Sequence, residues 1–228
     1  FNFTPDYLIQ IHKRLFTGIF DLAGVIRPYN ITKKEWVLDG DTVLYSSFEM
    51  IRQTLEYDFR EEKNVDYSSL DATQAVKQIC KFISGIWQIH PFAEGNTRAT
   101  AVFIIKYLQT FGFSINNAVF EKNSWYFLNA LVRANYNDLQ HGVRETTLYL
   151  EQFFSNLLLG TDYELKNRRL HLDWQDEAAL KCQNEIQSAT DIVPKRQNDT
   201  LELSMEELAL LHIIRNDPTI TQASIAKI

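Results

Sequence analysis

Apolar residues recur every three or four positions along most of the first 160 residues, which is the spacing of amphipathic α-helices. Before residue 90, for example, apolar side chains stand at 79, 82, 83, 86, 87 and 89. The pattern predicts helices over residues 5–22, 46–59, 70–89, 96–111, 123–136 and 143–159. We therefore expect a mainly α core.

Residues 31–45 do not follow the helical spacing. Alternating and β-branched residues stand there on both sides of Asp39-Gly40, a dipeptide typical of tight hairpin turns. We expect a small β-hairpin in this segment.

Polar stretches divide the rest of the chain. The spacing predicts a core over 1–160, a connector with one further amphipathic helix over 161–200, and short helices over 201–228. The last segment fits either a helical hairpin that packs on the core or the start of a DNA-binding helix-turn-helix.

Composition narrows the class of protein. The 228 residues are 45% hydrophobic and 13% aromatic, enough for one core domain with an appendage. A net charge of −6 argues against broad nucleic-acid binding by the core. We find no uninterrupted apolar run of about 18 residues and no export leader, so we expect no membrane span and a cytoplasmic protein. Cys80 and Cys182 lack metal-ligand spacing and are predicted to be free thiols.

The segment from His90 to Thr100 brings several chemical groups together between two predicted helices. Pro91 ends the first helix, and Gly95 with Asn96 can begin the second. Backbone N–H groups at a helix start attract anions, and a glycine lets a phosphate approach the backbone closely. The segment therefore predicts a phosphate-binding loop.

The side chains of this loop suggest its chemistry. Glu94 is placed to hold Mg²⁺, which takes one or two carboxylates beside phosphate oxygens. Arg98 offers a permanent charge for a second phosphate group. His90, with an ordinary pKa near ~6.5, can accept a proton from an attacking hydroxyl. Singly, each has a simpler explanation, a helix cap for the histidine and a surface ion pair for the other two.

The loop resembles the signature of the Fic family, His-Pro-Phe-x-(Asp/Glu)-Gly-Asn-Gly-Arg-x-x-Arg. The positions that match are His90, Pro91, Phe92, Glu94, Gly95, Asn96 and Arg98. Residues 15–27 also resemble the first core helix of the family and its exit. The resemblance implies a Fic-type helical bundle whose hairpin is a flap that holds the target side chain. The candidate flap residues are Val37, Leu38, Val43 and Leu44, although a merely decorative hairpin stays open.

The resemblance further implies transfer of AMP from ATP to a Tyr, Ser or Thr hydroxyl of a target protein, with Mg²⁺ as cofactor. His90 would deprotonate the hydroxyl, Glu94 would hold the magnesium, and Arg98 would grip the β-phosphate. The amides of Gly95, Asn96 and Thr97 would form the anion hole. Residues 130–139 resemble the helix that closes over the adenine, which makes Asn135 a candidate base contact or, alternatively, a helix cap.

Two positions depart from the signature. Thr97 replaces its third glycine, and Ala101 replaces its second arginine, the usual partner of the γ-phosphate. Several alternatives therefore stay open: another phosphate-containing donor, removal of AMP, or a Doc-like kinase. Since residues 201–228 resemble the opening helices of a winged helix domain, a nucleotide-responsive DNA-binding regulator is a further alternative. The target protein and a homo-oligomeric state are also left open.

Overall fold

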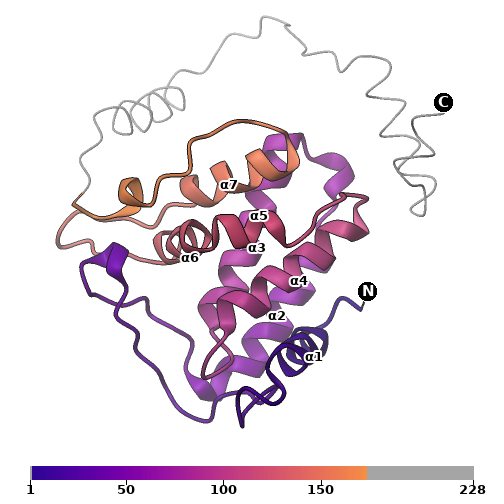
Figure 1. Cartoon of the computed structure of the whole chain (residues 1–228), viewed down its shortest axis with the longest axis vertical. Helices are drawn as coiled ribbons and strands as arrows, with labels where there is room; N and C mark the ends of the chain where they lie inside the picture. Colours follow the sequence, from indigo (N-terminus) through magenta and orange to yellow (C-terminus); the bar gives the residue numbers. More distant parts are fainter. Residues whose placement is uncertain (1, 174–228) are drawn as a thin grey trace, which may run out of the picture. The chain divides into compact units, whose positions relative to one another are not determined.

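The protein, described by a computed structural model over residues 2–173, is built of helices (Figure 1). They are α1 (Pro5–Phe16), α2 (Ile51–Lys63), α3 (Ala72–Ile89), α4 (Asn96–Thr110), α5 (Ala118–Lys122), α6 (Ser124–Arg133) and α7 (Leu148–Leu158). Short 3₁₀ turns are η1 (Trp36–Leu38), η2 (Phe48–Met50), η3 (Tyr67–Ser69) and η4 (Asn167–Leu170). The prediction of a mainly α core is confirmed. The further amphipathic helix predicted within the connector (residues 174–189), with Cys182, and the winged-helix-like segment at 201–228 lie outside the described residues.

Helix α3 is the centre of the core. It packs against α2, α4, α6 and α7, while α1 lies against α2 and α4. Its start is fixed by a capping box, in which Asp71 and Gln74 each accept a backbone N–H of the other. Cys80 is buried on this helix as a free thiol, in agreement with the prediction. Within residues 2–173, every helix is too short or too polar to span a lipid bilayer.

Helix α1 ends six residues earlier than the spacing predicts. The Thr17 hydroxyl donates to the carbonyl of Lys13 at 2.6 Å, and Gly18 takes a left-handed conformation with φ +83°. Both features are typical of a helix end. The exit loop then brings Arg27 under the motif.

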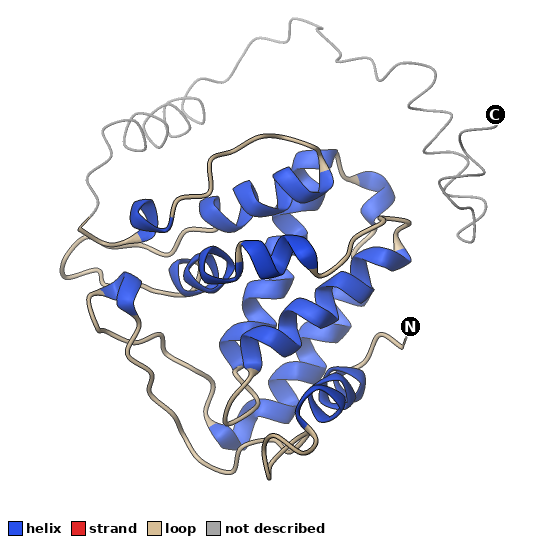
Figure 2. Cartoon of the chain, viewed as in Figure 1, coloured by secondary structure: helices blue, strands red, loops and turns tan. Residues whose placement is uncertain are grey.

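The predicted β-hairpin at 31–45 is not formed, and Figure 2 shows this segment as loop with a single helical turn. The turn itself is where expected, since Asp39 and Gly40 both have positive φ. Just before it, however, the adjacent Val37 and Leu38 are both buried in the core. Two consecutive inward side chains break the two-residue period of a strand and fit η1 instead. The loop is closed by the N–H of Glu35, which donates to the carbonyl of Asp41 at 2.9 Å.

Arg27 joins this 31–45 loop to the motif. Its side chain is 1% exposed, and burial lowers its pKa. The guanidinium donates to four backbone carbonyls, those of Tyr29, Ser46, Ile89 and His90. Its own backbone N–H donates to the carbonyl of Pro91 at 2.9 Å. A buried charge is tolerated only when its donors are satisfied in this way.

We expect Arg27→Met to lower the free energy of unfolding by roughly 3 kcal/mol, because it leaves several carbonyls without a donor. The matched control is Arg60→Met, whose side chain is 65% exposed, has a 3.8 Å ion pair with Glu61 and lies over the Tyr57 ring at 5.4 Å from its centroid. That change should cost less than about 1 kcal/mol. Urea unfolding followed by circular dichroism measures both, and equal losses would contradict the role given to Arg27.

Candidate active site

The motif loop starts at His90, the residue that ends α3. His90 has φ 50° and ψ 59°, a left-handed conformation that is rare outside glycine. Its N–H donates to the carbonyl of Trp87 at 3.0 Å, and its carbonyl accepts the Arg27 Nε–H at 2.8 Å. The surroundings therefore hold a strained backbone in place, as is common at functional sites.

The His90 imidazole is 3% exposed and has a defined tautomer. Its Nδ1 lies 3.2 Å from the carbonyl oxygen of Trp87. A carbonyl can only accept, so Nδ1 carries the proton and Nε2 has the free lone pair. Within the described residues Nε2 is buried and without a hydrogen-bond partner. The Tyr45 ring covers the imidazole at 4.3 Å between centroids.

Burial lowers the pKa of His90 to about 3, and the positive charges of Lys33 and Arg27 act in the same direction. The imidazole is therefore neutral at pH 7. A neutral imidazole with an unpartnered Nε2 is the protonation state that a general base requires.

His12 of α1 fastens the other end of the loop. Its Nδ1 accepts the Gly24 N–H at 2.8 Å, so its Nε2 carries the proton and donates to the carbonyl of Glu94 at 2.9 Å. Its ring stacks on Phe92 with centroids 3.7 Å apart. His12 was not predicted as a site residue, since its only signal in the sequence is a histidine on the apolar face of a helix.

Asn96 closes the loop from within. Its side chain accepts the N–H of Phe92 at 2.9 Å and donates to the carbonyl of Phe92 at 2.7 Å. The side chain is therefore committed to the loop. Only the backbone N–H of Asn96 remains for a ligand.

Gly95 begins α4 with φ +79°. A Cβ there would lie 2.5 Å from atoms of the Phe16 ring. The glycine is therefore needed for packing as well as for backbone conformation. Because Ala99 donates the first helical bond, to the carbonyl of Gly95 at 3.0 Å, the N–H groups of residues 96–98 form the open first turn of α4.

Thr97 and Arg98 extend this first turn. The Thr97 hydroxyl accepts the indole N–H of Trp87 at 2.9 Å, so its own proton is left to donate. Arg98 is exposed, and its guanidinium carbon lies 4.7 Å from the Phe16 ring centroid. Ala101, one turn later, is 8% exposed and belongs to the core.

A cavity of about 310 Å³ connects these groups. Its lining includes every residue predicted from the motif: His90, Glu94, Gly95, Asn96, Thr97 and Arg98. Lys33, Lys34 and Glu35 line it from the 31–45 loop, and Leu128 lines it from α6. The Glu94 carboxylate is 63% exposed and lies 3.5 Å from the Lys33 ammonium. The cavity thus combines a base, an acid and the N-terminus of a helix.

The other predicted site residues lie outside this cavity. Asn135 donates through Nδ2 to the carbonyls of Leu131 at 2.9 Å and Ser84 at 3.2 Å, the geometry of the alternative helix cap. Val37, Leu38 and Val43 are buried in the core, whereas Leu44 is 85% exposed. The side chains of the first three are therefore not available to a bound target, and the carbonyl of Val37 already accepts the N–H of Leu172 at 3.1 Å.

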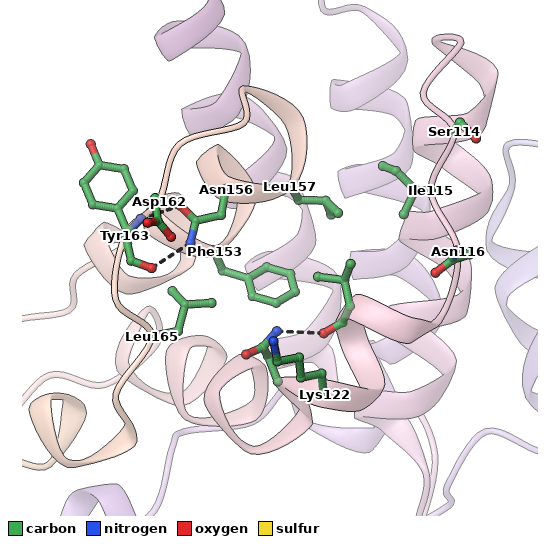
Figure 3. Close-up of a pocket in the computed structure, with 12 residues that line it drawn as sticks. Ser114, Ile115, Asn116, Lys122, Phe153, Asn156, Leu157, Asp162, Tyr163 and Leu165 are labelled. Atoms are coloured by element: carbon green, nitrogen blue, oxygen red, sulfur yellow. Dashed lines mark hydrogen bonds between the residues drawn. The ribbon is translucent and has the colours of Figure 1, made fainter. Parts of the chain in front are cut away.

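A larger cavity, of about 530 Å³, lies between α5, α7 and the segment that follows α7 (Figure 3). Asn156 shapes it by pairing with the backbone N–H of Tyr163 at 2.7 Å and its carbonyl at 2.8 Å. None of the motif residues lines it. The smaller cavity, which the motif residues line, is therefore the candidate active site.

Known proteins resemble this chain in sequence and in fold. Residues 2–108 match the sequence model of the Fic/DOC family. Protein adenylyltransferase VbhT of Bartonella schoenbuchensis is 26% identical over 219 residues, which cover 95% of this chain and 44% of that protein. The chain thus spans less than half the length of this relative.

The fold is similar to the crystal structure of BepC, a VirB-translocated effector protein from Bartonella tribocorum with bound AMPPNP. The TM-score is 0.51 at 21% identity, and the match covers 68% of this chain and 74% of that one. At this identity the likeness concerns the fold alone.

We expect NMR titration to show the His90 imidazole unprotonated well below pH 6.5, because burial and Lys33 lower its pKa. Lys33→Met should raise this pKa, while Lys106→Met on the exposed face of α4 should not. The unfolded chain has an ordinary histidine pKa, so this group's stabilisation is complete above pH ~6.5 and is lost as the pH falls toward the folded pKa. An ordinary midpoint near ~6.5 would contradict the description of the site.

We expect Gly95→Ala to destabilise the protein more than Gly112→Ala. Both glycines have positive φ, but a Cβ at Gly112 meets nothing within 4 Å. Gly112→Ala should cost about 1 kcal/mol from backbone strain alone, and Gly95→Ala should add roughly 1–3 kcal/mol from overpacking against Phe16. Thermal unfolding measures the difference, and equal losses would argue against the close Phe16 contact.

Proposed function

We propose that the chain is a protein AMP transferase, from the premise that residues 2–108 match the Fic/DOC family. It moves AMP from ATP to a Tyr, Ser or Thr hydroxyl of a target protein and releases pyrophosphate. The observation that carries the proposal is the buried, unpartnered Nε2 of His90 in one cavity with Glu94 and the first turn of α4. The name of VbhT and the AMPPNP bound to BepC support the same choice.

Glu94 is the residue that would hold Mg²⁺. Its carboxylate stands at the cavity with a cation, the Lys33 ammonium, already 3.5 Å from Oε2, and one carboxylate beside phosphate oxygens suffices for this ion. When bound, the ion would neutralise charge on the α- and β-phosphates. The donor set therefore fits the expected cofactor.

The transfer itself needs a base and an anion site. The target oxygen forms a bond to the α-phosphorus, its proton passes to Nε2 of His90, and the bond to the β-phosphate oxygen breaks. The carbonyl of Trp87, 3.2 Å from Nδ1, stabilises the imidazolium that forms. Because nearby phosphates raise the pKa of a histidine, His90 becomes a stronger base once the nucleotide is bound.

The first turn of α4 would hold the phosphates. The N–H groups of residues 96–98 and the Thr97 hydroxyl, fixed by the Trp87 indole, are oriented before the reaction. Arg98 is exposed and can move from the Phe16 ring to the β-phosphate. Preorganised charge of this kind dominates phosphoryl-type transfers.

The 31–45 loop is our candidate for the segment that holds the target. Gln88 donates to the carbonyl of Leu44 at 3.1 Å, which ties the loop to the last turn of α3 beside His90. We propose that the backbone at Val43 and Leu44 pairs with the target segment. Leu128, which lines the cavity, is the proposed contact for the adenine ring of the nucleotide. Asn135 could contact adenine only if it gave up one of its two hydrogen bonds to backbone carbonyls.

A second candidate uses a different phosphate chemistry. Ala101 lacks the charge that the family signature places near the γ-phosphate, so another donor or a kinase-like pose of ATP is the specific alternative. Transfer of a γ-label in place of an α-label would favour it.

We expect the protein, with Mg²⁺ and ATP labelled at the α-phosphate, to label a protein in a host lysate. His90→Ala should lower the amount of label incorporated by roughly 100-fold or more. Its binding of AMPPNP, measured by calorimetry, should change little. His141→Ala is the control, since this histidine's side chain is 78% exposed. Equal labelling by wild type and His90→Ala would overturn the proposal.

A further inference from the structure

Helix α4 gives the cavity one arginine fewer than the family signature would. The family signature has two arginines there, whereas this chain has Arg98 followed by the buried Ala101. The other cations that line the cavity, Lys33 and Lys34, both come from the 31–45 loop. A polyphosphate bound here therefore meets the loop as well as the helix.

Lys33 is the better placed of the two lysines. Its Nζ lies 3.5 Å from Oε2 of Glu94, and its side chain is 30% exposed. Its backbone N–H donates to the Thr42 hydroxyl at 3.3 Å, which fixes its position across the loop. After burial, its positive charge is the next cause of the lowered pKa of His90, and it opposes the rise that burial causes in the pKa of Glu35. Lys33 is thus close to the base and to the metal-binding acid at once.

Lys34 differs from its neighbour. It is exposed, and within residues 2–173 it forms no ion pair. The same segment of chain therefore offers one lysine directed at Glu94 and one that is not.

We propose that Lys33 takes the place of the missing second arginine and binds the phosphates beyond the α-phosphate. This inference rests on the proposed function. In the free protein the ammonium pairs with Glu94. When Glu94 is engaged in the nucleotide complex, the ammonium donates to β- and γ-phosphate oxygens, which a flexible point charge with three donors reaches easily.

This arrangement links the donor to the target. Because Lys33 belongs to the 31–45 loop, a bound triphosphate draws that loop toward the motif. It also neutralises one of the charges that, after burial, lower the pKa of His90. A nucleotide with its full phosphate chain therefore strengthens the base more than AMP does.

The test is calorimetry with Mg²⁺, comparing AMPPNP with AMP on the wild-type protein, Lys33→Met, Lys33→Arg and Lys34→Met. Lys33→Met should weaken AMPPNP binding roughly 10- to 100-fold, the effect of a lost charged hydrogen bond, and leave AMP binding within about twofold. Lys33→Arg should retain most of the AMPPNP affinity. Lys34→Met should have the smaller effect, within about fivefold.

The outcomes separate this inference from the function on which it rests. If the wild-type protein binds neither nucleotide, the proposed function fails and Lys33 has no role in it. If the wild-type protein binds AMPPNP and Lys33→Met binds it equally well, or if both lysine variants weaken it equally, the role of Lys33 alone is overturned. A loss of AMP binding by Lys33→Met in the same proportion would also overturn it, because Lys33 would then act through the fold.

Discussion

A buried guanidinium holds this site together. Arg27 is 1% exposed and donates to carbonyls from three separate stretches of chain, at residues 29, 46 and 89–90. Because an unsatisfied buried charge is so unfavourable, these stretches cannot separate without a large loss of stability. The same contacts hold His90 in a left-handed conformation. With His12 fixing the carbonyl of Glu94 from α1, the motif loop is held at both ends by the first helix and its exit.

The buried and the exposed groups of the cavity have different electrostatic roles. Burial keeps His90 neutral, and the carbonyl of Trp87 determines which nitrogen carries the proton. The acid and the lysine stand at the exposed side, where Lys33 pairs with Glu94 at 3.5 Å. A buried general base beside a solvent-exposed anion site suits proton abstraction followed by transfer at phosphorus. The Trp87 indole, which donates to Thr97, connects the two halves.

The sequence predicted the parts of the protein that depend on local pattern. The long core helices followed from apolar spacing, and the motif residues were adjacent in the chain, so their shared cavity could be expected. The predicted end of α1 was wrong because apolar positions continue past Gly18, whose left-handed backbone conformation follows the end of the helix. The prediction of a β-hairpin was wrong because the adjacent Val37 and Leu38 are both buried in the core. Arg27, His12 and Lys33 were missed because they act across 60 or more residues, a distance that no local pattern reveals.

In the proposed reaction, Nε2 of His90 takes the proton from a hydroxyl that attacks the α-phosphorus. A crystal structure of the protein with Mg²⁺ and AMPPNP tests it most directly. We expect the α-phosphate on the N–H groups at the start of α4, Mg²⁺ on Glu94, and Nε2 facing the α-phosphorus from the side opposite the leaving pyrophosphate. A γ-phosphate facing His90, or a nucleotide bound in the larger cavity beside Asn156, would contradict it.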